Sequence, residues 1–68
     1  MVYAFYPCRS DGSSIAFDLM DFPDDATALA YAPRVLNRHD SAIEVVIWAG
    51  ERRLDPVGRT EAARMAAE

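Results

Sequence analysis

One cysteine and one histidine are the residues of this 68-residue chain best suited to catalysis. Cys8 precedes Arg9, whose cation could lower the thiol pKa and favour the nucleophilic thiolate. Nucleophilic catalysis would also need a base, and His39 is the only imidazole available. His39 follows a predicted helix, however, where histidine usually complements the helix dipole. We therefore expect a structural thiol, a helix-end histidine and no catalytic residue.

Charged residues cluster in two places where they could bind ions. Four aspartates surround the start of the predicted helix: Asp18, Asp21, Asp24 and Asp25. Their spacing does not match the calcium loop of an EF-hand, and turns and helix N-caps also use aspartate. The basic residues near the C-terminus could meet an acidic partner or a small anion, or discourage aggregation at a sheet edge: Arg52, Arg53 and Arg59. We favour the structural role for both groups.

Composition argues against several classes of partner. The net charge of −4 should repel phosphate backbones, so we expect no nucleic-acid binding. No apolar run approaches the roughly 18 residues of a membrane span, and no signal-peptide pattern occurs, so no membrane association is expected. The single cysteine fits a cytoplasmic protein. Because a structural zinc site needs about four cysteine or histidine ligands, and no cofactor-binding motif occurs, we expect neither a metal nor a cofactor.

Alternating apolar residues predict two β-hairpins. Residues 2–6 and 14–20 have the pattern of strands and are joined by a turn that contains an Asp-Gly pair. Residues 42–48 form the strongest strand, with apolar side chains on both faces, as in the centre of a sheet. Residues 52–57 should return beside it as an edge strand, because Pro56 lacks a backbone donor.

One main helix is predicted between the hairpins, over residues 26–38. Pro33 falls inside it, and a proline costs a helix interior about 3 kcal/mol. We therefore expect a kink or a break into two short pieces, or a second helix that begins at Pro33. Residues 62–67 are rich in alanine and predict a short, weak C-terminal helix, and residues 59–68 could form a frayed tail.

These elements predict a single α+β domain over residues 1–68 with a ββαββ layout. A crossover through the helix can place the third strand beside the first. The expected fold is a four-stranded antiparallel sheet of order 2-1-3-4 with the main helix on one face. We expect the face beneath the helix to carry Ile15, Phe17, Leu19, Ile43, Val45 and Ile47.

The other face of the sheet should then lack a helix. Val46, Trp48, Met20 and Ala16 point to it, and the first strand contributes either Tyr3 and Phe5 or Val2, Ala4 and Tyr6. A chain this short buries little surface, and without disulfides or metals a second subunit is the remaining source of stability. We therefore expect a homodimer whose interface contains Trp48, Val46, Met20, Tyr3 and Phe5.

Two segments resemble short bacterial proteins classed as domains of unknown function, common in alphaproteobacteria. Residues 24–28 open an alanine-rich helix after a strand pair, and residues 45–54 end a strand with Trp-x-Gly-x-Arg and a leucine. The resemblance implies the same ββαββ layout and supplies no activity. Pro33 departs from the continuous helix that such proteins suggest.

The sequence assigns no biochemical activity, and two functions remain open. The first is a non-enzymatic interaction or structural module that self-associates through the uncovered sheet face. The second is a small-ligand-binding accessory or regulatory domain with its site at a dimer seam. An enzyme is disfavoured, because no phosphate loop, nucleophile elbow or zinc-protease motif occurs and the chain is small for a deep pocket.

Overall fold

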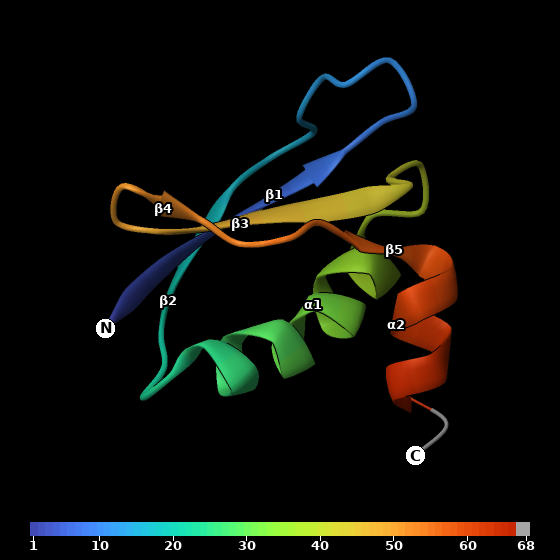
Figure 1. Cartoon of the computed structure of the whole chain (residues 1–68). Helices are drawn as coiled ribbons and strands as arrows, with labels where there is room; N and C mark the ends of the chain where they lie inside the picture. Colours follow the sequence, from blue (N-terminus) through green and yellow to red (C-terminus); the bar gives the residue numbers. More distant parts are fainter. Residues whose placement is uncertain (67–68) are drawn as a thin grey trace.

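The structure, a computed structural model, describes residues 1–66 and places two helices on one face of an antiparallel sheet (Figure 1). The elements are β1 (Val2–Cys8), β2 (Asp18–Asp21), α1 (Asp25–Arg38), β3 (Glu44–Ala49), β4 (Arg52–Arg53), β5 (Val57–Gly58) and α2 (Arg59–Ala66). The strand order is β2-β1-β3-β4, and β5 also pairs with β3. The predicted α+β class and the order 2-1-3-4 are therefore confirmed, and β5 is an addition.

The centre of the sheet is the pairing of β1 with β3, which runs from Tyr3 opposite Ala49 to Cys8 opposite Glu44. Alternate residues of a strand point to opposite faces, so one side of this pair is continuous and apolar. The buried residues that meet α1 there are Tyr3, Phe5 and Pro7 of β1, Val45, Ile47 and Ala49 of β3, and Ala28, Ala32, Val35 and Leu36 of α1 itself. The helix alanines are small, which lets the helix backbone approach the sheet.

The strand β2 is shorter than predicted, and the segment before it contains one extra residue. Asp18 lies opposite Phe5, whereas the isolated bridge further along joins Ser14 to Cys8. Such a bulge reverses the face to which later side chains point. Ile15 packs against the core as predicted. The predicted core positions of Phe17 and Leu19 are wrong, because these side chains are 57% and 61% exposed.

The outer partner of β3 is also interrupted. Arg53 lies opposite Trp48 and Val57 lies opposite Val45, so the segment between them holds one residue more than β3 requires. The predicted strand over residues 52–57 is thus divided into β4 and β5, with Pro56 in the gap.

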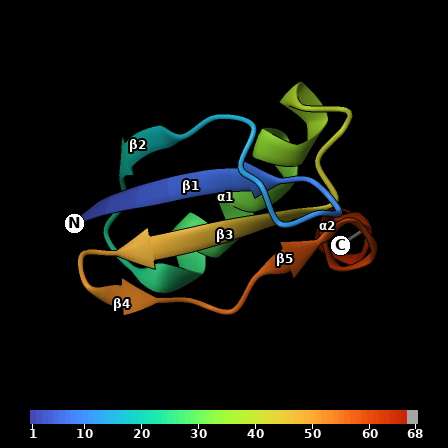
Figure 2. The same cartoon turned by 90° about the horizontal axis from the view of Figure 1, so that it is seen from above.

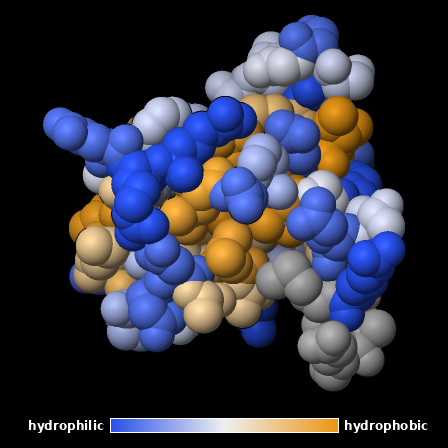
Figure 3. All heavy atoms as spheres, in the orientation of Figure 1, coloured by the Kyte–Doolittle hydropathy of each residue, from blue (hydrophilic) through white to orange (hydrophobic). Residues whose placement is uncertain are grey.

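In space-filling form, the same view as Figure 1 shows apolar atoms gathered in the middle of the surface among hydrophilic ones (Figure 3).

Ile43, which directly precedes β3, was also predicted to face the core. Its side chain is 47% exposed. Its backbone nitrogen donates to the Cys8 carbonyl at 2.8 Å, and its carbonyl accepts from the Arg59 nitrogen at 3.3 Å. The prediction is therefore wrong for Ile43, whose backbone holds the end of the sheet together while its side chain remains largely outside the core.

The helix α1 is continuous through Pro33, so the predicted break into two short pieces and the predicted second helix are wrong, whereas the kink stays a prediction. Its first turn is capped by Asp24, whose Oδ1 accepts from the backbone nitrogen and the hydroxyl of Thr27 at 2.8 and 2.7 Å. These hydrogen bonds lower the pKa of Asp24. Val35 and Leu36, which follow Pro33, are almost wholly buried. Packing of this face against the sheet outweighs the backbone hydrogen bond that the proline cannot make.

Arg59, the first residue of α2, binds the C-terminal end of α1. Its guanidinium group donates to four backbone carbonyl oxygens, at distances of 2.6 to 3.3 Å: those of Leu36, His39, Asp40 and Ala42. A helix end leaves such carbonyls without partners inside the helix. Ala62 of α2 is 7% exposed and belongs to the core cluster. The short C-terminal helix is thus confirmed, and residues 67–68 of the predicted tail lie outside the described residues.

We predict that Arg59→Met lowers the free energy of unfolding by about 2 kcal/mol, because it removes hydrogen bonds from a charged donor to helix-end carbonyls. Urea unfolding followed by circular dichroism measures the change. Arg64→Met, which alters an exposed arginine of the same helix, should change stability by less than about 0.5 kcal/mol. Equal losses in the two variants would contradict the role assigned to Arg59.

Candidate functional site

The candidate site is the sheet face that points away from α1 and α2, called the open face below. Its residues are Val2, Ala4, Tyr6 and Cys8 of β1, Phe17 and Leu19 at β2, Glu44, Val46 and Trp48 of β3, and Arg53 of β4. The register places Ala4 between Leu19 and Trp48. Seen from above, the strands lie in front of α1, and α2 lies beyond the end of β5 (Figure 2). Neither helix of residues 1–66 covers this face.

The structure places only Val46 and Trp48 of the five predicted interface residues on the open face. Tyr3 and Phe5 are wholly buried under α1, so their predicted place is wrong. Because β1 is apolar on both faces, the sequence allowed either Tyr3 and Phe5 or Val2, Ala4 and Tyr6 on the open face. The structure places the second set there. Met20 lies opposite Tyr3 and packs against the core, so its predicted place is also wrong.

Large apolar side chains remain exposed on the open face. Val2, Phe17 and Leu19 are more than half exposed, and Trp48 is 36% exposed. The rings of Tyr6 and Phe17 stack with their centroids 5.7 Å apart and their planes 18° from parallel. The sequence interpretation missed Phe17 and Leu19, because a strict alternation over residues 14–20 contains no signal for the extra residue before β2.

Two neighbouring hollows divide the open face. The first has a volume of about 280 Å³ and is lined by Val2, Ala4, Tyr6, Leu19, Trp48 and Gly50. The second, called the loop hollow below, has a volume of about 310 Å³ and is lined by Tyr6, Cys8, Gly12, Ser14, Val46, Trp48 and Arg53. Tyr6 and Trp48 belong to both and separate them. The first hollow is apolar, whereas the loop hollow adds a hydroxyl, a thiol and a cation.

Cys8 lies at the end of β1 within the loop hollow and is 8% exposed. Burial, and then the nearby carboxylate of Glu44, raise the pKa of the thiol, which Arg53 offsets in part. The thiol donates to the carbonyl of Tyr6 at 3.3 Å. Arg9, the residue expected from sequence to activate the thiol, is not among the groups that shift its pKa. The arrangement favours the neutral thiol and a structural role.

We predict that the thiol of folded Cys8 reacts with iodoacetamide at neutral pH at least about tenfold more slowly than in the urea-unfolded chain, because burial and a raised pKa both reduce the thiolate. Mass spectrometry of timed samples measures both rates. A folded rate equal to or above the unfolded rate would show that Cys8 is activated.

The other residues considered for chemistry are separated by the fold. His39 is the C-cap of α1, as expected from sequence, and its backbone nitrogen donates to the Leu36 carbonyl. The four aspartates have different partners: Asp18 pairs with Arg38, Asp21 with the Met1 amino group, Asp24 with Thr27, and Asp25 with Arg52. Within residues 1–66, no three His, Cys, Asp or Glu side chains are grouped so as to hold a metal ion.

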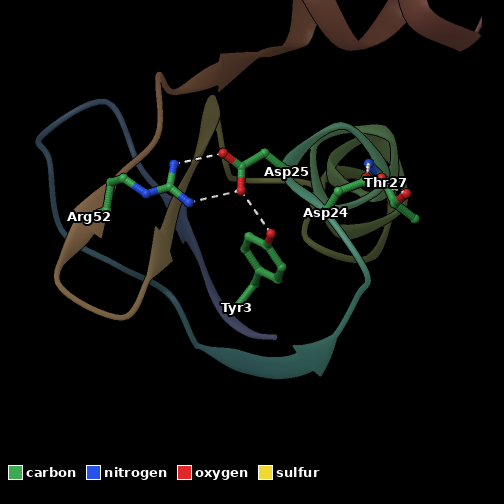
Figure 4. A network of polar contacts seen from close by, with 5 residues as sticks. All are labelled: Tyr3, Asp24, Asp25, Thr27 and Arg52. Carbon is green, nitrogen blue, oxygen red and sulfur yellow. Dashed lines mark hydrogen bonds and ion pairs between the residues drawn. The ribbon is translucent and has the colours of Figure 1, made fainter.

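The most connected polar group lies at the N-terminal end of α1, on the helix side of the sheet (Figure 4). The Asp25 carboxylate accepts two hydrogen bonds from Arg52, at 2.6 and 3.0 Å, and one from the Tyr3 hydroxyl at 2.8 Å. The bonds from Arg52 and then Tyr3 lower the pKa of Asp25 to about 2. Burial and the bond to Asp25 raise the pKa of Tyr3. These bonds join β1, α1 and β4, so the group has a structural role.

We predict that the stability difference between the wild type and Asp25→Asn shrinks as the pH falls from about 4 to about 2. The pKa of Asp25 is lowered in the folded state, so its contribution is complete above the unfolded value near 3.8 and is lost as the pH approaches about 2. Urea midpoints across this range measure the effect. Asp55→Asn, an exposed control, should leave the wild-type pH dependence intact, and a constant difference for Asp25→Asn would contradict the assignment.

The three arginines grouped by sequence have separate positions. Arg52 binds Asp25, Arg59 binds the end of α1, and Arg53 lines the loop hollow. Within residues 1–66, the side chain of Arg53 makes no hydrogen bond or ion pair. It is therefore the member of the group that a ligand or partner could use.

Comparisons with known proteins found no matching family model, curated protein or solved structure. The resemblance to short alphaproteobacterial proteins therefore stays a prediction. Neither helix in the described part of the chain is long and apolar enough to cross a membrane.

Proposed function

We propose that this chain is a small interaction module that forms a homodimer through the open face. The observation that carries the proposal is the exposed apolar surface of Val2, Phe17, Leu19 and Trp48, gathered on the face opposite the helices. Contiguous apolar patches on small proteins usually mark interaction sites, and tryptophan is frequent at their centres. A cytoplasmic location, expected from the single cysteine, is part of the same proposal.

The shape of the open face supports a second copy as the partner. In the cross-strand row of Leu19, Ala4 and Trp48, the small residue lies between two large ones. The apolar hollow of about 280 Å³ lies over it. A two-fold dimer pairs the same patch with itself, so a projecting side chain of each copy must meet a depression of the other. Leu19, which is 61% exposed, provides the projection, and the hollow at Ala4 provides the depression.

The size of the chain also favours association. A domain of this length buries a smaller fraction of its surface than a larger domain, and its one cysteine cannot form an internal disulfide. Covering the open face would bury apolar area at about 25 cal/mol per Å². Dimerisation would thus add to the stability of each subunit.

The alternative function, binding of a small ligand, is favoured by a different observation. The loop hollow is shallow and combines aromatic walls with the cation of Arg53, which has no ion-pair partner within residues 1–66. Its volume of about 310 Å³ lies at the lower end for ligand pockets. This hollow shares Trp48 with the proposed interface. A ligand there would lie beside the dimer seam.

We predict that the wild-type chain is a dimer at tens of micromolar concentration and that Leu19→Arg is a folded monomer. A charge in the centre of a desolvated interface has no partner, which costs several kcal/mol and should weaken association at least about a hundredfold. Light scattering coupled to size exclusion measures the mass, and circular dichroism checks the fold.

Ile43→Arg is the matched control, because Ile43 is similarly exposed but lies outside the open face. It should remain dimeric. A wild-type monomer at these concentrations, or an unchanged dimer in Leu19→Arg, would overturn the proposal. Leu19 is a better test than Trp48, which is more buried and whose replacement would also disturb packing within one subunit.

A further inference from the structure

The loop hollow differs from the rest of the open face because a loop rises beside it. Residues 9–13 stand above the sheet at the end of β1 (Figure 1). Two backbone hydrogen bonds of 2.8 and 2.9 Å close this loop, from Arg9 to Ser13 and from Gly12 to Arg9. Gly12 has a φ of 88°, a left-handed conformation that glycine adopts without strain. These bonds give the loop a defined conformation, so it forms one wall of the loop hollow.

The side chain of Asp11 adds a second set of bonds inside this wall. Its Oδ1 accepts from the backbone nitrogen and the hydroxyl of Ser13, at 2.9 and 2.7 Å. These bonds lower the pKa of Asp11. The carboxylate is thus engaged within the loop, and it is not among the residues that line the hollow.

The charge of the loop hollow is opposite to that of the whole chain. Its lining contains one cation, Arg53, and no carboxylate, whereas the net charge of the protein is −4. Glu44 lies on the same face directly opposite Cys8, at the end of β3 farthest from Trp48, and burial and then its carboxylate raise the pKa of that thiol. The register places Arg53 directly opposite Trp48. Arg53 and Trp48 are therefore cross-strand neighbours, and both line the shallow loop hollow.

We propose that the loop hollow binds a planar aromatic acid. The acid group pairs with Arg53, whose planar guanidinium matches a carboxylate in two parallel hydrogen bonds. The aromatic ring packs against Trp48 and Tyr6, since ring pairs add attraction beyond the area they bury. Ser14 offers a hydroxyl at the wall of the hollow.

The inference goes beyond the proposed dimer and does not rest on it, because one chain supplies every lining residue. Only Tyr6 and Trp48 are shared with the apolar hollow assigned to the second copy. Variants at Leu19 and Arg53 therefore test the two proposals separately.

The test is a titration with 2-naphthoate, and with 2-naphthamide as the uncharged analogue of the same shape. The chain has one tryptophan, so the single indole N–H signal in a two-dimensional ¹⁵N NMR spectrum reports on Trp48 directly. We expect saturable shifts of this signal by the acid with a Kd of about 1 mM or tighter, as the size of the ligand allows. The amide should bind roughly fivefold more weakly, because it lacks the charge-assisted pair.

Arg53→Gln should remove the preference for the acid while leaving weak binding of both compounds. Arg64→Gln, the same change of charge on α2, should keep the wild-type preference. Leu19→Arg should bind the acid at least as tightly as the wild type, because Tyr6 and Trp48 also lie on the proposed dimer interface, which a monomer leaves uncovered. Equal affinity for acid and amide in the wild type, a preference that survives Arg53→Gln, or no shift of the Trp48 signal at about 10 mM acid would each overturn the proposal.

Discussion

The pairing of β1 with β3 is the interaction on which the other elements depend. It brings residues 3–8 and 44–49 into one continuous ladder and directs Tyr3, Phe5 and Pro7 to the same side as Val45, Ile47 and Ala49. That apolar surface is where the buried stripe of α1 can dock, and β2 and β4 then add to the two outer sides. Because both helices use this side, the apolar residues of opposite alternation, Trp48 among them, remain uncovered in residues 1–66. The open face is thus a direct consequence of how the core is filled.

Much of the fold could be predicted from local signals. The Asp-Gly turn, the helix start at Asp24 and the apolar stretch of β3 each have a physical preference for one structure, and together they give the strand order. The failures arose where long-range packing decides. Pro33 disfavours a continuous helix locally, yet Val35 and Leu36 beyond it are buried and the helix continues. The docking of α2 depends on Arg59 reaching four carbonyls of a distant segment, which no short sequence pattern encodes.

The candidate site was predicted only in part, again because long-range packing decides which face some residues occupy. Val46 and Trp48 follow from a regular strand, in which the face of each residue is fixed by its neighbours. Phe17, Leu19 and Met20 follow a bulge, so each lies on the face opposite to that given by simple alternation. Tyr3 and Phe5 belong to a strand that is apolar on both sides, where only the position of the helix distinguishes the faces. Arg53 could be separated from its neighbours Arg52 and Arg59 only once their partners were known.

Arg52 and Arg59 make both ends of α1 depend on one short stretch of the chain. Arg52 binds the first turn of α1 through Asp25, and Arg59 binds the carbonyls at its last turn. The two residues flank the broken edge formed by β4 and β5, which is tied to the sheet by few backbone pairs. If this edge detaches, the helix loses its polar anchors at both ends in the same event. Fraying of the sheet margin and melting of the helix should therefore be one cooperative opening, and hydrogen exchange in the two segments should give the same free energy of opening.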